Sequence, residues 1–135
     1  MITPLRIETL PVREDADIVR VRQLVRVRAA ELGFGVLDQT RLMTAASELG
    51  RNTLIHGGGG TMLLESLVKD QRRGVRLTFE DKGPGIADIN QAMTDGYTTR
   101  GGLGLGLPGS KRLVNEFEIV SRVGEGTRVT ATRWT

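Results

Sequence analysis

The spacing of apolar residues predicts two long helices in the first half of the chain. Between residues 14 and 32, apolar positions recur every three or four residues and therefore share one helical face. Acidic residues occupy the first turn of this segment, and Gly33 lies just past its end. A second helix is predicted from Asp38, as its N-cap, to Ile55. The glycines at 57–60 end that helix.

Runs of β-branched and apolar residues predict strands before and after these helices. The expected strands cover residues 4–10, 61–68, 74–81, 117–123 and 127–134. The second and third are joined by a polar turn and form a hairpin, and the last two form another hairpin across a Gly-Glu-Gly turn. Strands on both sides of helices favour an α+β two-layer sandwich, with a mixed, mostly antiparallel sheet and helices on one face.

The segment between these two hairpins has a different character. Residues 82–103 lack a clear period and are rich in Gly, Thr and Asp, so they are expected to form a long ordered loop. Loops of this length are uncommon unless they have a function. A third helix is predicted over residues 104–115. Because no linker or repeat interrupts the pattern, residues 1–135 are expected to form a single domain.

Composition narrows the class of protein. The chain of 135 residues is 39% hydrophobic and 26% charged, as expected of one globular domain. It has no cysteine, no signal peptide and no apolar run near the roughly 20 residues that span a bilayer, so a cytoplasmic protein is expected. Arginines at 20, 22, 26 and 28 form either a solvated helix face or a surface for nucleic acid or an acidic partner. Scarce aromatic residues argue against single-stranded nucleic acid.

The first motif with candidate chemistry is Glu48-Leu-Gly-Arg-Asn52 in the second predicted helix. Glu48 and Asn52 are four residues apart and therefore share a face. That face is either an ordinary polar surface or the lining of a pocket. In a pocket, the Asn52 amide oxygen suits Mg²⁺, whose other ligands would be waters and phosphate oxygens. Glu48 suits a group that accepts a proton from a hydroxyl or water. His56, further along this row, is expected to cap or pack.

The second motif is Glu80-Asp81-Lys-Gly83-Pro-Gly85-Ile86 at the end of a predicted strand. It is either a simple turn or a base-binding segment. In the latter, the Asp81 carboxylate accepts a hydrogen bond from a purine amino group. The glycines Gly83 and Gly85 then let the backbone approach the flat base closely.

The third motif is the glycine-rich run that opens the third predicted helix, with glycines at 101, 102, 104 and 106. Exposed backbone N–H groups at a helix N-terminus bind phosphate. A dinucleotide fingerprint is disfavoured because a loop, not a strand, precedes the run. The P-loop pattern is disfavoured because Ser110 and Lys111 stand in swapped order. The three motifs in this order describe an ATP site.

These motifs resemble the N, G1 and G2 boxes of the GHKL (Bergerat) ATP-binding fold. Within that superfamily the chain is similar to the anti-sigma-type serine/threonine kinases, and above all to the RsbT-type switch kinases of stressosome signalling. The resemblance spans nearly the full length. It is carried by Glu31-Leu-Gly-Phe-Gly35, Asp38-Gln39, Ser47-Glu-Leu, Arg51-Asn52, Glu80-Asp81, Gly83-Pro-Gly-Ile86, Gly101-Gly-Leu-Gly104, Gly106-Leu-Pro-Gly109, Lys111-Arg-Leu113 and Gly124-Glu-Gly-Thr127.

The resemblance assigns roles to individual residues. Glu48 matches the catalytic base, and Asn52 matches the Mg²⁺ ligand. Asp81 matches the aspartate that binds adenine, and Gly83 and Gly85 match the glycines beside the base. Thr127 matches a threonine on a neighbouring strand that helps Asp81 hold adenine, often through a water molecule. The phosphate loop is matched by Gly102, Gly104 and Gly106. Residues 87–101 match a lid, in which Thr99 and Arg100 lie in a segment near the γ-phosphate.

The function implied by the resemblance is that of an ATP- and Mg²⁺-dependent protein kinase. Its expected substrate is a STAS-domain antagonist protein in a partner-switching pathway, and a downstream phosphatase or other effector is a further expected partner. Neither nucleic acid nor membrane is expected as a partner. One alternative is an RsbW-like anti-sigma factor, which would sequester a sigma factor. A histidine kinase catalytic domain ranks last. It would need a phospho-acceptor histidine on a separate helical hairpin, and the single histidine, His56, belongs to the predicted helix that carries Glu48 and Asn52.

Overall fold

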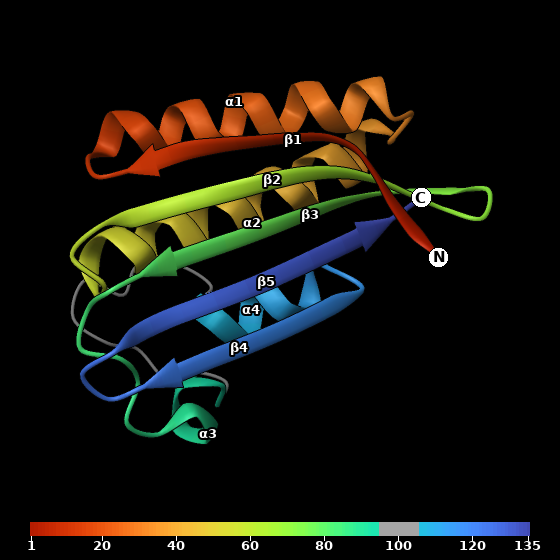
Figure 1. Ribbon diagram of the computed structural model, residues 1–135. Coiled ribbons are helices and arrows are strands. Elements are labelled where there is room, and N and C mark those ends of the chain that lie inside the picture. Colours follow the sequence, from red (N-terminus) through yellow and green to blue (C-terminus); the bar gives the residue numbers. More distant parts are fainter. Residues whose placement is uncertain (95–105) are drawn as a thin grey trace.

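A five-stranded sheet forms one layer of the fold, and helices cover one of its faces (Figure 1). The structure is a computed structural model that describes residues 1–94 and 106–135. The strand order is β1-β2-β3-β5-β4, and all four ladders are antiparallel. The elements are β1 (Ile2–Val12), α1 (Asp15–Glu31), α2 (Val36–Ile55), β2 (Gly60–Lys69), β3 (Arg72–Asp81), α3 (Ile89–Ala92), α4 (Gly106–Arg112), β4 (Glu116–Arg122) and β5 (Gly126–Trp134).

The predicted two-layer architecture is confirmed, with every described strand pair antiparallel. Leu42, Ala46 and Leu49 of α2 are buried against the sheet, where Leu77 and Phe79 of β3 are also fully buried. Burial of each of these leucine and phenylalanine side chains stabilises the fold by about 1.5–3 kcal/mol. This core fixes the position of α2 over β3, and these are the elements that carry two of the three motifs.

Helix α1 follows the predicted apolar period, and its start is held by Asp17. The carboxylate of Asp17 accepts the backbone N–H groups of Arg13 (2.9 Å) and Glu14 (3.2 Å). These hydrogen bonds satisfy donors that would otherwise lack partners at the helix N-terminus. The prediction that the arginines at 20, 22, 26 and 28 form an exposed row is wrong for Arg28. Arg28 is buried, and its guanidinium pairs with Glu8 of β1 and with Glu31.

Helix α2 begins one turn earlier than predicted, with Gly35 as its N-cap. The predicted N-cap, Asp38, lies inside the first turn instead. Its carboxylate accepts hydrogen bonds from Arg41 (2.7 Å) and from Arg133 of β5 (2.8 Å). Arg133 also donates to the carbonyl of Leu113, just beyond α4 (3.0 Å). Asp38 therefore links α2 to β5, and through Arg133 to the end of α4, rather than capping a helix.

The segment predicted as a loop over residues 82–103 contains a short helix, α3. Its N-cap is Asp88, whose carboxylate accepts the N–H of Gln91 (3.0 Å). Sequence periodicity cannot reveal a four-residue helix, because one turn is too short to show a period. Helix α4 ends at Arg112, three residues earlier than predicted. Among the described residues, no helix is both long enough and apolar enough to cross a membrane.

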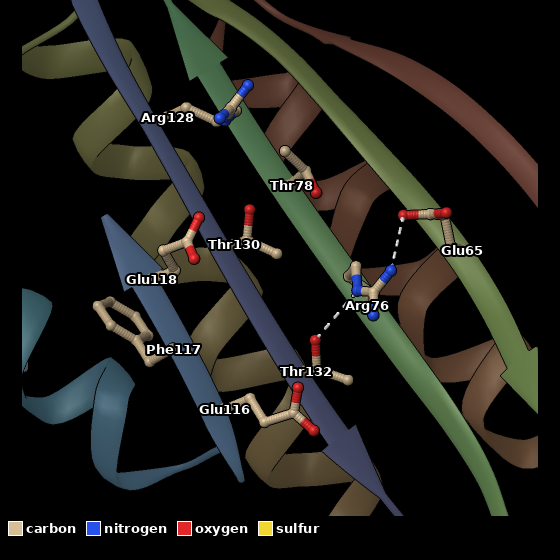
Figure 2. A pocket seen from close by; sticks show the side chains of 9 residues that line it. All are labelled: Glu65, Arg76, Thr78, Glu116, Phe117, Glu118, Arg128, Thr130 and Thr132. Atoms are coloured by element: carbon tan, nitrogen blue, oxygen red, sulfur yellow. Dashed lines mark hydrogen bonds and ion pairs between the residues drawn. The ribbon is translucent and has the colours of Figure 1, made fainter. Parts of the chain in front are cut away.

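The face of the sheet away from α1 and α2 is open and largely polar. Figure 2 shows a hollow on this face. Within it, Arg76 donates to the hydroxyl of Thr132 (3.3 Å) and lies 4.0 Å from a carboxylate oxygen of Glu65. The hollow is lined by Glu65, Arg76, Thr78, Glu116, Phe117, Glu118, Arg128, Thr130 and Thr132. It contains none of the residues of the predicted ATP site.

Candidate nucleotide-binding site

The end of α2 and the end of β3 meet at a contact between Gly57 and Asp81. The backbone carbonyl of Asn52 accepts the N–H groups of His56 (2.9 Å) and Gly57 (3.3 Å), which closes the last turn of α2. A Cβ atom at Gly57 would lie only 2.3 Å from the carboxyl carbon of Asp81. Two of the sequence motifs are thus brought together by a contact that only glycine permits.

Glu48 and Asn52 lie one turn apart on α2, as predicted. The Glu48 side chain is 15% exposed, and its carboxylate lies 3.9 Å from the guanidinium of Arg51. The Asn52 amide nitrogen is buried and has no hydrogen-bond partner among the described residues. A buried donor without a partner costs about 1–3 kcal/mol, so such groups mark places where a ligand or ion belongs. A phosphate oxygen is a suitable acceptor for this donor.

Asp81 is the last residue of β3, and one of its two carboxylate oxygens accepts a hydrogen bond within the described residues. Its Oδ1 atom accepts the N–H of Gly83 (2.9 Å), which forms the turn after the strand. Its Oδ2 atom has no hydrogen-bond partner in residues 1–94 and 106–135. Asp81 pairs directly with Thr127 of β5, so both side chains lie on the helix-covered face of the sheet. This arrangement suits an amino group that donates to the carboxylate.

The hydroxyl of Thr127 takes part in a second polar contact on β4. It lies 2.7 Å from the hydroxyl of Ser121, which is its direct cross-strand neighbour. The Ser121 hydroxyl also accepts the N–H of Ile86 (2.8 Å) and donates to the carbonyl of Gly126 (3.1 Å). Asp81, Thr127 and Ser121 therefore form a row of polar side chains across three strands.

The glycines of the second motif have packing roles in the structure. A Cβ atom at Gly83 would lie 2.7 Å from the backbone of Gly57. Gly85 has a φ of 77°, and a Cβ there would lie 2.2 Å from the carbonyl oxygen of Arg122. Each glycine thus allows the turn after β3 to pack closely, against the end of α2 in one case and against β4 in the other. Their predicted contact with a base stays a prediction.

The phosphate-loop prediction falls largely outside the described residues. Thr99, Arg100, Gly102 and Gly104 all lie in the segment 95–105, as does the second half of the predicted lid. Gly106 is described, and it begins α4 with a φ of 64°. Its carbonyl accepts the hydroxyl of the fully buried Ser110 (2.9 Å).

Residues 37–134 match a family described as histidine kinase-, DNA gyrase B-, and HSP90-like ATPase. The chain belongs to this family. The match covers α2 from its second residue, the whole sheet except β1, and every predicted site residue. The family is one of ATPases, so the predicted nucleotide chemistry is confirmed at that level, and so is the predicted GHKL fold.

Within the family, the chain groups with RsbT-type serine/threonine kinases. It is 50% identical over 118 residues to the serine/threonine-protein kinase RsbT of Bacillus subtilis, which covers 87% of this chain and 89% of that protein. It is 30% identical over 132 residues to an anti-sigma F factor of Clostridium novyi, with 93% and 90% covered. Among solved structures, it matches a crystal structure of the RsbU and RsbW domains of a Mycobacterium tuberculosis protein, with a TM-score of 0.65 and 24% identity. That match covers 97% of this chain and 32% of the other, and it shows the fold alone.

Two residues of this GHKL site were missed by sequence reasoning. The sequence indicates only a helix stop at Gly57, because its contact with Asp81 joins segments that are distant in sequence. Ser121 was not singled out at all. A signal was present, since Ser121 alternates with Phe117 and Ile119 and is therefore a polar residue at an inward position of β4. Such positions need a hydrogen-bond partner.

Proposed function

We propose that this chain is a protein kinase that transfers the γ-phosphoryl group of ATP to a serine or threonine of a STAS-domain antagonist protein. The proposal includes a cytoplasmic setting and a single domain over residues 1–135. The observation that carries it is the juxtaposition of Asn52 and Asp81 through Gly57, in a chain that is half identical to a serine/threonine kinase over most of its length.

Each described site residue has a role in this transfer. Asp81 and Thr127 hold the base. Asn52 would hold Mg²⁺ through its amide oxygen, and its buried amide nitrogen donates to a phosphate oxygen. The metal, when bound, neutralises charge on the phosphates. Glu48 accepts the proton of the attacking hydroxyl, because its side chain, 15% exposed, lies one turn from Asn52 on the same face of α2.

The segment outside the described residues completes this proposal. Gly102 and Gly104 of that segment, together with Gly106 at the start of α4, bind the phosphates through backbone N–H groups. Thr99 and Arg100 are proposed to act on the γ-phosphate as part of a lid over residues 87–101. The partner hydroxyl then approaches between this lid and Glu48, so the partner is expected to bind better to the ATP-bound chain than to the chain without nucleotide.

Phosphorylation of the partner acts as an electrostatic switch. A phosphoserine or phosphothreonine adds about 1.5–2 negative charges at neutral pH. Such a change at a protein interface releases the kinase from its antagonist. The freed kinase then binds a downstream phosphatase or another effector. A role as an anti-sigma factor is the second candidate, favoured by the 30% identical anti-sigma F relative.

The test uses the purified chain, a purified STAS-domain protein from the same organism and Mg-ATP labelled at the γ-phosphate. We expect label on the STAS protein, and we expect no transfer when EDTA removes the metal. Sigma-factor fragments in a parallel binding experiment separate the two candidates. A kinase of the RsbT type leaves them unbound, whereas an anti-sigma factor retains them.

A further inference from the structure

The hydroxyl group of Ser121 makes three hydrogen bonds, and together they fix the direction of each one. A serine hydroxyl has one hydrogen to donate and two lone pairs that accept. The backbone N–H of Ile86 must donate to it, at 2.8 Å. The carbonyl of Gly126 can only accept, at 3.1 Å, so the single Ser121 hydrogen goes there. The remaining contact, 2.7 Å to the Thr127 hydroxyl, therefore requires Thr127 to be the donor.

This assignment determines what Thr127 offers to a ligand. Its one hydrogen is committed to Ser121, so only lone pairs remain on its oxygen. A free threonine hydroxyl rotates and either donates or accepts, but this one acts as an acceptor alone. Its cross-strand neighbour, Asp81, is likewise acceptor-only when ionised. The site thus presents two acceptor oxygens side by side on the same face of the sheet.

We propose that Ser121 is a specificity-determining residue that makes the kinase select adenine over purines that carry a 6-carbonyl group. Two acceptor oxygens attract an exocyclic amino group and repel a carbonyl oxygen. Ser121 acts through Thr127 and is a positioning residue. This inference rests on the proposed function, because it takes Asp81 and Thr127 as the residues that read the base.

The contacts around Ser121 explain why serine serves here. Its neighbours along β4 on the inward side are apolar, so the hydroxyl is the polar exception on that face. Through Ile86 it also reaches the turn that follows Asp81. That turn is tied to the β4–β5 hairpin a second time, where the N–H of Gly124 donates to the carbonyl of Pro84 (2.8 Å). The turn therefore keeps its position when the Ser121 hydroxyl is removed.

The test compares Mg-ATP with Mg-ITP, whose base has a carbonyl group in place of the 6-amino group. Calorimetric titration gives the two dissociation constants for the wild-type chain and for Ser121→Ala. In the variant the Thr127 hydroxyl is free to rotate and donate to the carbonyl. We expect the preference for ATP over ITP to shrink about tenfold, the effect of roughly one hydrogen bond. Ser121→Thr keeps the hydroxyl and is expected to keep the preference.

A double-mutant cycle separates this role from simple bracing of the fold. If Ser121 acts through Thr127, Ser121→Ala has no further effect on the ATP/ITP ratio once Thr127→Val is present. Thr127→Val alone is expected to narrow the ratio, which keeps the inference testable if Ser121→Ala fails to fold. Equal weakening of both nucleotides by Ser121→Ala, with an unchanged ratio, would overturn the inference. So would an unchanged ratio in Thr127→Val. A wild-type chain that binds no ATP would overturn the proposed function instead.

Discussion

Gly57 lies directly against the carboxylate of Asp81, so close that a Cβ atom at position 57 would come within 2.3 Å of the carboxyl carbon. The contact links the helix that carries Asn52 to the strand that ends in Asp81. It sets the distance between the residue proposed to hold the metal and the residue proposed to read the base. Asp81 cannot keep its position if residue 57 acquires a side chain.

Gly57→Ala is therefore expected to weaken ATP binding by about tenfold or more, because the methyl group displaces the carboxylate from a hydrogen-bonding position. Gly58→Ala is the matched control in the same glycine run. A Cβ atom there has open space around it, so alanine at 58 adds backbone strain from the φ of 74° but no contact with Asp81. Calorimetry with Mg-ATP gives both affinities. Equal affinities for the two variants would show that the contact with Asp81 does not matter for binding.

Asp81→Asn is expected to remove most of the thermal stabilisation that Mg-ATP gives. A ligand that binds only the native state raises the midpoint of unfolding, and an amide cannot replace the acceptor-only carboxylate. Glu80→Gln is the control, because Glu80 is exposed and points to the opposite face of the sheet. GTP is expected to stabilise the wild-type chain little. Equal midpoints with ATP and GTP would contradict the adenine assignment.

Glu48→Gln is expected to retain binding of ATP and of the partner but to slow phosphoryl transfer by roughly two to four orders of magnitude, as for loss of a general base. Glu118→Gln, an exposed carboxylate on the open face of the sheet, is the control and is expected to transfer at the wild-type rate. Single-turnover transfer to the STAS partner measures the chemical step. A normal rate in Glu48→Gln would rule out Glu48 as the proton acceptor.

Asp38→Asn is expected to destabilise the fold at neutral pH and not in acid. The hydrogen bond from Arg41, together with the charge of Arg133, lowers the pKa of Asp38. A carboxyl group with a lowered pKa in the folded state stabilises the fold above its unfolded pKa of about 4 and loses that effect as the pH falls through the folded value.

Because Asp38 is partly exposed, the loss at pH 7 is expected to be about 0.5–1 kcal/mol. Urea unfolding at pH 7 and near pH 3 measures it. Glu125→Gln, in the exposed β4–β5 turn, is expected to change little at either pH. If Asp38→Asn lowered the free energy of unfolding equally at both pH values, the ion pairs of Asp38 with Arg41 and Arg133 would not be the source of the stabilisation.

The long periodic elements and the ordered motifs could be predicted from sequence. The helix over 14–32 and both hairpins follow from apolar spacing and turn residues, and the structure confirms them with small shifts at their ends. The placement of Glu48 and Asn52 on one helical face followed from their spacing alone. Local patterns of this kind depend on neighbouring residues, so they can be read in a single chain.

The features that could not be predicted depend on contacts between distant segments. Asp38 resembled an N-cap by residue type, but its partner Arg133 is 95 residues away. From sequence Arg28 resembles an exposed charge, but in the fold it pairs with Glu8 of β1. The roles of Gly57 and Ser121 depend on strand register, which fixes which residues meet across the sheet. These contacts can be identified only when the three-dimensional arrangement of the strands and helices is known.

The most direct test of the account is to identify the chemical form of the transferred phosphoryl group. The chain is incubated with labelled Mg-ATP and a purified STAS-domain protein, and the products are analysed by mass spectrometry and by acid stability of the label. We expect one acid-stable phosphoserine or phosphothreonine on the STAS protein, formed far more slowly with Glu48→Gln. Label recovered only as free phosphate, or as an acid-labile phosphohistidine, would contradict the assignment of this chain as a serine/threonine kinase.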